Sequence, residues 1–188
     1  MNVKTLKTLF VMLFFFGTTQ VAKGQTTSEL ERYDIIISEV MAKPTPTIGL
    51  PAVEYIELHN RLPHPVSLQN WKLNVGNTVK KLPNITLDSC GYAVIIAQKF
   101  ETDFAPFCEH IITLSSLAIT DGGQSLTLYD QHDAVIHHIQ FKREWHSETI
   151  KQEGGWSLEM VDENWPCAEK WNWDSSTDPL GGTPGRPN

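Results

Sequence analysis

The side chains best suited to chemistry gather around a proline-rich loop near the start of the chain. Glu39 precedes this loop, and Glu57 and Asn60 follow it. Carboxylate and amide oxygens are the ligands that Ca²⁺ takes from proteins, so these three residues form a candidate ion or partner patch. Their spacing matches no known calcium loop, and Lys43 places an ammonium group among them. We expect Lys43 to pair with Glu39 or Glu57; hydrogen bonds that pin the loop to the adjacent strand are the alternative.

The histidines and serines form no catalytic pattern in this sequence. His137 and His138 are consecutive in an expected strand, so their side chains point to opposite faces and cannot share a metal ion. The chain has no H-x-x-x-H helix, no cysteine pair with zinc-ligand spacing and no G-x-S-x-G turn. We therefore expect surface histidines, no catalytic residue, no resident metal, no cofactor and no enzymatic activity.

Three cysteines, Cys90, Cys108 and Cys167, leave the redox state open. In an oxidising compartment, one disulfide with one remaining thiol is plausible, and three different pairings would give it. Three reduced, buried cysteines are the alternative. The sequence does not choose among these arrangements.

The first 24 residues have the features of a secretory signal peptide. Lys4 and Lys7 precede a short apolar run, and Ala22-Lys23-Gly24 supplies small residues at the expected cleavage site. Cleavage there leaves Gln25 at the new N-terminus, followed by a short polar leader over residues 25–33. No other apolar run approaches the length of a membrane span. We expect an exported protein in the periplasm, at the cell surface or in the medium, with no membrane insertion after cleavage.

The overall charge argues against a nucleic-acid partner. The chain has 15 basic and 22 acidic residues, a formal net charge of −7. Loss of the signal peptide would remove three lysines and make the charge more negative. A duplex-binding protein needs a basic stripe to neutralise phosphates, and none is present.

Short segments of β type, separated by turns every 8–12 residues or so, must position these side chains. The first is Ile35–Met41. In the next, Ile56 and Leu58 share one face while Tyr55 and Glu57 share the other. No window of 12 or more residues shows a convincing helical apolar stripe. Such regular spacing of short strands predicts an all-β sandwich or barrel.

Several phrases, in a fixed order, resemble the lamin-tail domain family in the form found in exported bacterial proteins. They are "DIIISEVMAKPTPTIGLPAVEYIELHN", "PVSLQNWKL", "GYAVI", "DGGQSLTLYDQHDAV", "GGWSLE", "WPC" and "NWDSSTDPLGGTPGRPN". The resemblance implies an immunoglobulin-like β-sandwich over residues 34–188, with an irregular tail from about residue 142. It also implies a non-catalytic structural or binding module whose partner is a protein or a cell-surface component. An accessory domain that presents or assists a secreted hydrolase or nuclease is the alternative.

Tryptophans crowd the expected tail. We expect Trp156, Trp165, Trp171 and Trp173 to be buried and to fasten the Gly- and Pro-rich closing stretch by packing, rather than by that stretch's own hydrogen bonding. Trp145, in "REWHSE", is expected to pack at the rim of the sandwich; a carbohydrate- or protein-contacting patch is the alternative.

Overall fold

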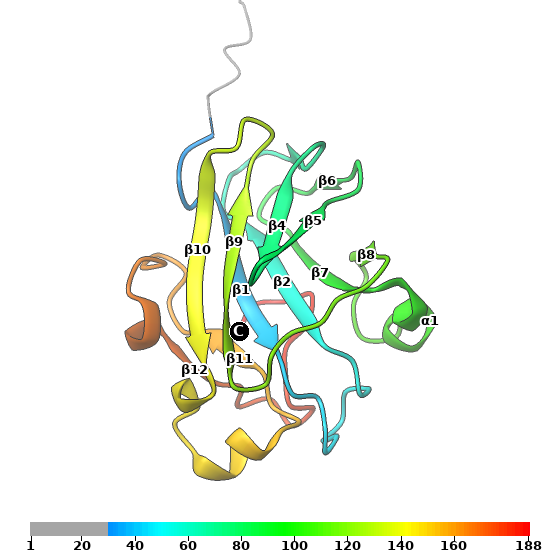
Figure 1. The fold of residues 1–188 in the computed structure, drawn as a ribbon, viewed down its shortest axis with the longest axis vertical. Coiled ribbons are helices and arrows are strands. Elements are labelled where there is room, and N and C mark those ends of the chain that lie inside the picture. The colour runs from blue at the N-terminus through cyan, green and yellow to red at the C-terminus, as the bar shows by residue number, and fades with distance from the viewer. Residues whose placement is uncertain (1–29) are drawn as a thin grey trace, which may run out of the picture.

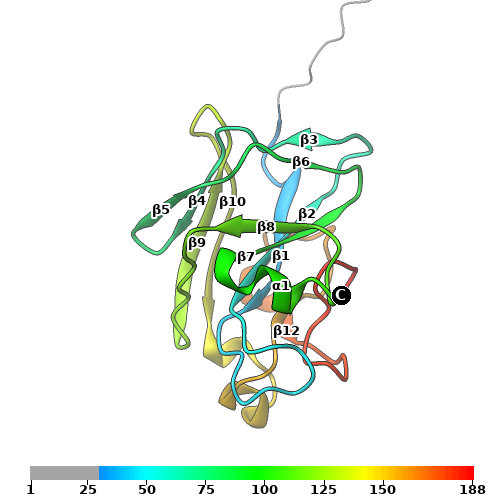
Figure 2. The same ribbon diagram turned by 90° about the vertical axis from the view of Figure 1, so that its right-hand side faces the viewer.

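The computed structural model describes residues 30–188, so the predicted signal peptide and most of the leader lie outside the described residues. Two β-sheets face each other, as Figure 1 and Figure 2 show. The six-stranded sheet has the order β12-β11-β1-β2-β7-β8, and the four-stranded sheet has the order β10-β9-β4-β5. A separate pair joins β3 to β6. The strands are β1 (Ile35–Met41), β2 (Tyr55–Asn60), β3 (Val66–Ser67), β4 (Lys72–Val75), β5 (Thr78–Lys81), β6 (Thr86–Leu87), β7 (Tyr92–Ala97), β8 (Ile111–Leu114), β9 (Gly123–Tyr129), β10 (Val135–Lys142), β11 (Leu158–Met160) and β12 (Trp173–Ser175).

Helical structure in the described part of the chain is limited to short segments of three to five residues between strands. The only α-helix of residues 30–188, α1 (Glu101–Phe104), follows the 3₁₀ turn η1 (Gln98–Phe100). Three further 3₁₀ turns are η2 (Arg143–Trp145), η3 (Thr149–Glu153) and η4 (Glu169–Asn172). None of the helices in this part is long and apolar enough to cross a membrane. The prediction of an all-β sandwich is confirmed.

The main core lies between the two sheets and follows the alternation of the strands. Ile56 and Leu58 of β2 point into it, together with Trp71, Leu73 of β4 and Ile139 of β10. Branched aliphatic side chains fit this pleated, enclosed surface well. Burial of this apolar area is the main contribution to the stability of the sandwich.

The other face of the six-stranded sheet is buried as well, which the alternation did not predict. Every residue of β1 and β2 is buried. A second apolar cluster on this outer face joins Met41, Tyr55, Val94 and Ile96 to Phe104 of α1. Residues 181–188, red in Figure 2, run along the same side of the sheet, away from the four-stranded sheet. The six-stranded sheet is therefore the middle layer of the molecule.

The expected irregular tail contains two strands. β11 pairs with β1, and β12 pairs with β11, so the six-stranded sheet extends past β1 by residues far along the chain. β11 lies within "WSLEMV", which the sequence already indicates as a strand-like segment, so the prediction of an irregular tail from about residue 142 is wrong for β12. It holds for residues 176–188, which contain no helix or strand.

Candidate functional site

Three carboxylates lie side by side on the outer face of the six-stranded sheet. Glu39 of β1 is the register partner of both Glu57 on β2 and Glu159 on β11. We call these three residues the carboxylate row. All three are buried, with Glu39 and Glu57 fully inaccessible. Glu159 was missed from the sequence because nothing in a local pattern connects β11 to β1.

Glu39, at the centre of the row, accepts hydrogen bonds from two different parts of the chain. The Tyr55 hydroxyl donates to Glu39 Oε1 at 2.5 Å, and the Thr183 backbone N–H donates to the same oxygen at 2.9 Å. Glu39 Oε2 is buried and has no hydrogen-bond partner among the described residues. One oxygen of this carboxyl group is thus fully used and the other is not.

The two flanking carboxylates bind the same 181–188 segment. Glu57 Oε2 accepts from the Gly185 N–H at 2.6 Å, while Glu57 Oε1 accepts from the Ser38 hydroxyl at 2.6 Å. Glu159 Oε1 accepts from the Thr183 hydroxyl at 3.0 Å. The carboxylate row therefore serves as a set of acceptors for a segment that has no regular hydrogen bonding of its own. We expected packing rather than the stretch's own hydrogen bonding to hold it; the structure adds hydrogen bonds from the stretch to carboxylates of other strands.

The glycines of the 181–188 segment explain how it can lie so close to the row. A Cβ atom at Gly182 would overlap the Tyr55 hydroxyl and would stand 2.7 Å from Glu39 Oε1. Gly185 has φ +81°, a conformation that residues with a side chain rarely adopt. A larger residue at either position would lift the backbone away from its acceptors.

Burial changes the acidity of the row. It raises the pKa of Glu39 to about 7, and the nearby Glu159 charge acts in the same direction. Burial, followed by the charge of Glu39, raises the pKa of Glu57 well above its ordinary value. Neighbouring carboxylates in a buried site resist simultaneous ionisation, so Glu39 and Glu57 hold protons at pH values where exposed glutamates lose them.

Lys43 and Asn60 do not take the places that the sequence suggested. Lys43 Nζ lies 3.8 Å from Glu153 Oε2, so the predicted pairing with Glu39 or Glu57 is wrong. Asn60 instead fastens a loop: its Nδ2 donates to the Asp88 carbonyl at 2.8 Å, and its Oδ1 accepts from the Leu62 N–H at 3.0 Å. Residues 30–188 contain no group of three or more His, Cys, Asp or Glu side chains placed to hold a metal ion.

A histidine, a tyrosine and a glutamate converge nearby, and no sequence pattern pointed to them. His59 Nδ1 lies 3.0 Å from Glu163 Oε2, and the Tyr92 hydroxyl donates to Glu163 Oε1 at 2.9 Å. The rings of His59 and Tyr92 stack with centroids 4.0 Å apart. Partial burial opposes ionisation of Glu163, but its contacts with His59 and Tyr92 bring the net pKa below the ordinary value. The cluster ties the turn after β11 to β2 and β7.

The expected division of His137 and His138 between opposite faces is confirmed. His137 is fully buried and its Nδ1 accepts from the Ile37 N–H at 2.8 Å, whereas His138 is exposed. Burial lowers the pKa of His137 to about 4. The expectation that the histidines lie at the surface is therefore wrong for His137 and for His59, which is 8% exposed.

The four predicted tryptophan anchors have different environments. Trp173 is buried at 4% exposure, and Trp156 is half-buried with Lys151 Nζ 4.6 Å from its ring centroid. Trp165 and Trp171 are 55% and 81% exposed, so the prediction that they anchor the closing stretch is wrong. Trp145 packs against the main core with its ring 6.1 Å from that of Trp173, in agreement with the expected rim position.

Trp171 borders an open hollow of about 470 Å³ between β10 and η4. We call this the tryptophan hollow; its lining residues are Gln140, Lys142, Trp145, Cys167, Ala168, Glu169, Lys170 and Trp171. Its size falls within the range of ligand pockets in proteins, roughly 300–1,000 Å³. Aromatic and polar side chains occur together in its lining.

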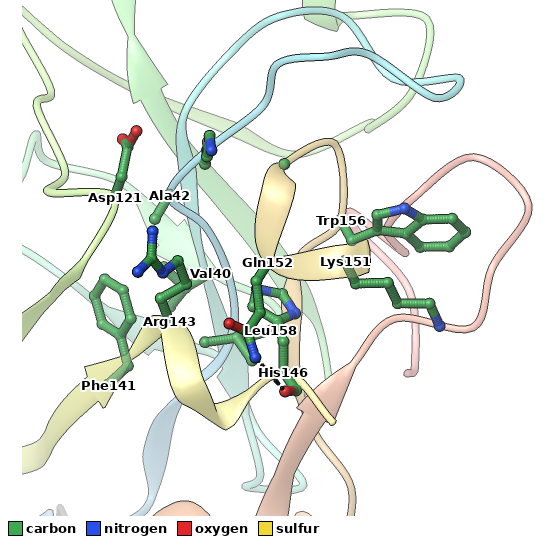
Figure 3. A pocket seen from close by; sticks show the side chains of 12 residues that line it. Val40, Ala42, Asp121, Phe141, Arg143, His146, Lys151, Gln152, Trp156 and Leu158 are labelled. Carbon is green, nitrogen blue, oxygen red and sulfur yellow. Dashed lines mark hydrogen bonds between the residues drawn. The ribbon is translucent and has the colours of Figure 1, made fainter. Parts of the chain in front are cut away.

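A second cavity, drawn in Figure 3, is too small for a ligand. It measures about 10 Å³ and lies where β1, the end of β10 and η3 meet. Gln152 Nε2 donates to the His146 carbonyl across it at 3.3 Å. Figure 3 shows Trp156 and Lys151 on the side away from Phe141. The cavity has room for about one water molecule.

The three cysteines form no disulfide. All are free thiols: Cys90 and Cys167 are exposed, and Cys108 is buried. The structure therefore supports neither the disulfide nor the alternative of three buried thiols. Burial raises the pKa of the Cys108 thiol to about 11, which leaves it protonated and unreactive at neutral pH.

Two packed sheets with an apolar interior define this molecule as an immunoglobulin-like β-sandwich domain. The family model of the Lamin Tail Domain matches residues 30–143, and the chain belongs to that family. The match covers β1 to β10; the strands β11 and β12 and the 181–188 segment lie beyond it. A comparison with curated proteins gave no match. Domains of this family are immunoglobulin-like structural modules, which is consistent with a non-catalytic role.

Proposed function

We propose that this chain is an exported, non-catalytic binding module that engages a cell-surface component or a protein through Trp165 and Trp171. The observation that carries the proposal is the 81% exposure of Trp171 beside a ligand-sized hollow. Tryptophan is enriched at the centres of binding sites, where its large surface becomes buried on contact.

Asn172 holds the backbone of the turn that carries these two tryptophans. The Asp162 N–H donates to Asn172 Oδ1 at 2.7 Å, and Asn172 Nδ2 donates to the carbonyls of Asp162 and Trp165 at 2.7 and 2.9 Å. The turn that carries both tryptophans is thereby tied to itself around a buried amide. A preorganised aromatic surface loses less entropy on binding than a flexible one, which supports a binding role for this turn.

The test is co-sedimentation of the purified protein with cell envelopes of the exporting organism. The double variant Trp165→Ala/Trp171→Ala is expected to bind at least tenfold more weakly than the wild type. Ile150→Ala is the matched control, because Ile150 is 71% exposed and lies outside the tryptophan hollow. Equal binding by wild type and double variant would refute the assignment of this surface. Capture of a secreted hydrolase or nuclease through the same tryptophans would favour the accessory role.

Export is tested separately by the mass of the mature protein. A chain that begins at Gln25 in the periplasm or the medium is expected. A product that keeps residues 1–24 and sediments with membranes would contradict it.

A further inference from the structure

We propose that the tryptophan hollow and the adjoining outer face of the four-stranded sheet bind a neutral polysaccharide chain. This inference rests on the proposed function and specifies its ligand. Nothing in the family match assigns a ligand to this region, because most of the hollow is formed by residues after 143.

The hollow supplies the aromatic part of such a site. Trp171 and Trp145 line it from η4 and η2, two turns that are brought together beside β10. An indole offers a flat, apolar and electron-rich face, and the C–H groups on one side of a sugar ring are complementary to it. Lys170 Nζ lies 5.0 Å from the ring centroid of Trp171, an attraction that favours one orientation of the indole.

The outer face of the four-stranded sheet supplies polar groups in line with the hollow. Along β10, His138, Gln140 and Lys142 alternate with buried residues and face solvent. Their register partners on β9 include the half-buried Ser125 beside Gln140, whereas Thr127, beside His138, is buried. From His138 to Lys142 this face extends for about 13 Å at the usual rise of a strand.

The polar groups of this face both donate and accept hydrogen bonds. The amide of Gln140 lies at the edge of the hollow, and the His138 imidazole is exposed, with its Nδ1 hydrogen-bonded to Thr127 Oγ1 at 2.8 Å. Hydroxyl, amide and imidazole groups have mixed donor and acceptor capacity. They suit a ligand whose hydroxyl groups also do both.

The charges around the hollow argue against other classes of ligand. Lys142 and Lys170 are accompanied by Glu169, so the lining is close to neutral and lacks the basic stripe that a phosphate backbone needs. The apolar side chains of the lining are Trp145, Ala168 and Trp171, with Cys167 beside them. A partner helix would require a longer continuous apolar strip. A neutral, hydroxyl-rich chain matches both the aromatic and the polar parts.

The test is titration of the folded protein with a panel of neutral hexasaccharides: cellohexaose, laminarihexaose, xylohexaose, mannohexaose and chitohexaose. Calorimetry and intrinsic tryptophan fluorescence provide two independent readouts. At least one sugar is expected to bind, and Trp171→Ala is expected to weaken that binding at least tenfold. Gln140→Ala should weaken it several-fold, and Ile150→Ala should leave it unchanged. Because Trp171 and Gln140 are exposed, the thermal melts of these variants should match that of the wild type.

Two results would overturn the inference while leaving the proposed function intact. One is failure of every hexasaccharide to bind although the protein still sediments with envelopes through Trp165 and Trp171; the partner is then an envelope component other than these neutral sugars. The other is sugar binding that Trp171→Ala does not weaken, which would place the sugar elsewhere. If the wild-type protein binds neither envelopes nor any of the sugars, both proposals are overturned together.

Discussion

Glu39 shows how a single side chain can be both necessary for the local structure and costly to the fold. Its Oε1 accepts two hydrogen bonds, yet its Oε2 has no partner and two other carboxylates flank it. An ionised carboxylate in such a place is destabilised by lost hydration and by repulsion. The protonated form avoids both costs.

Glu39→Gln is therefore expected to stabilise the protein at alkaline pH. The pKa of Glu39 is raised to about 7 in the folded protein from an ordinary value of 4.5. The folded state binds the extra proton, so stability falls as pH rises from about 4.5 to 7 and stays low above that. The variant should gain roughly 3 kcal/mol at pH 8 and nothing near pH 4. Thermal melts from pH 4 to 8.5 measure this.

The control for this prediction is Glu101→Gln, an exposed glutamate of α1. Its effect should be small and should not grow with pH. A Glu39→Gln protein that is less stable than the wild type at pH 8 would show that the ionised carboxylate is the form that the fold requires.

The contribution of His137 to stability is expected to depend on pH in the opposite direction from that of Glu39. Burial lowers its pKa to about 4 from 6.5, so the contribution of the neutral ring is complete above pH 6.5 and is lost as pH falls towards 4. Nδ1 accepts from Ile37, so the proton of the neutral ring lies on Nε2. ¹⁵N NMR should show this tautomer, still uncharged, at pH 5.5. A ring that titrates near pH 6.5 would contradict the burial argument.

At the scale of elements, the 181–188 segment acts as a cover for the outer face of the six-stranded sheet. It brings backbone donors of Thr183 and Gly185 to Glu39 and Glu57. An irregular segment can donate to these carboxylates because its backbone N–H groups are not used in hydrogen bonds with a neighbouring strand. The segment is held because its backbone lies close to the carboxylate row, rather than because it buries apolar area.

Gly182→Ala should separate the segment from the row. The added Cβ would overlap the Tyr55 hydroxyl and crowd Glu39 Oε1. Tyr55 and Glu39 are both buried and cannot move aside. We expect a loss of about 2 kcal/mol, typical of overpacking, and a fall in Tm of about 4–8 °C for a domain of this size. Gly122→Ala is the matched control, because a Cβ there meets no atom within 4 Å. Equal melts of the two variants would show that the segment is loosely attached.

At the scale of the whole molecule, the sandwich extends beyond the part that matches the family. β11 and β12 contribute Leu158, Met160 and Trp173 to the main core. A chain of residues 30–143 would lose these side chains and would expose the edge of β1. Loss of even one such core side chain costs about 2–5 kcal/mol, against a total stability of about 5–15 kcal/mol.

Residues 30–143 alone are therefore expected to be unfolded or aggregated, and residues 30–188 to melt cooperatively. Circular dichroism and limited proteolysis of the two fragments measure the difference. A cooperative melt of the shorter fragment would show that β11 and β12 are additions to an already stable sandwich.

Local patterns predicted the strands well and the surroundings of the side chains poorly. The bounds of β1 were predicted as observed, because a run of β-branched residues between turns determines a strand locally. The burial of Glu57 depends on Gly185, 128 residues away, which no strand pattern contains. The exposure of Trp171 was missed for the same reason: residue type predicts a preference for burial, but only the fold decides what covers a side chain.

The pairing of β1 with β11 has a consequence for the time at which the protein can fold. β1 lies at the centre of the six-stranded sheet, yet one of its two neighbours begins at Leu158, 117 residues after Met41. A nascent chain therefore cannot complete this sheet until nearly all of the domain has been synthesised, and contacts of such long sequence separation form slowly. If the protein is exported as we propose, this delay would keep the polypeptide unfolded during its passage through a translocation channel. The same delay leaves the apolar edge of β1 unprotected until β11 emerges, so a chaperone that holds the unfinished chain should raise the yield of folded protein.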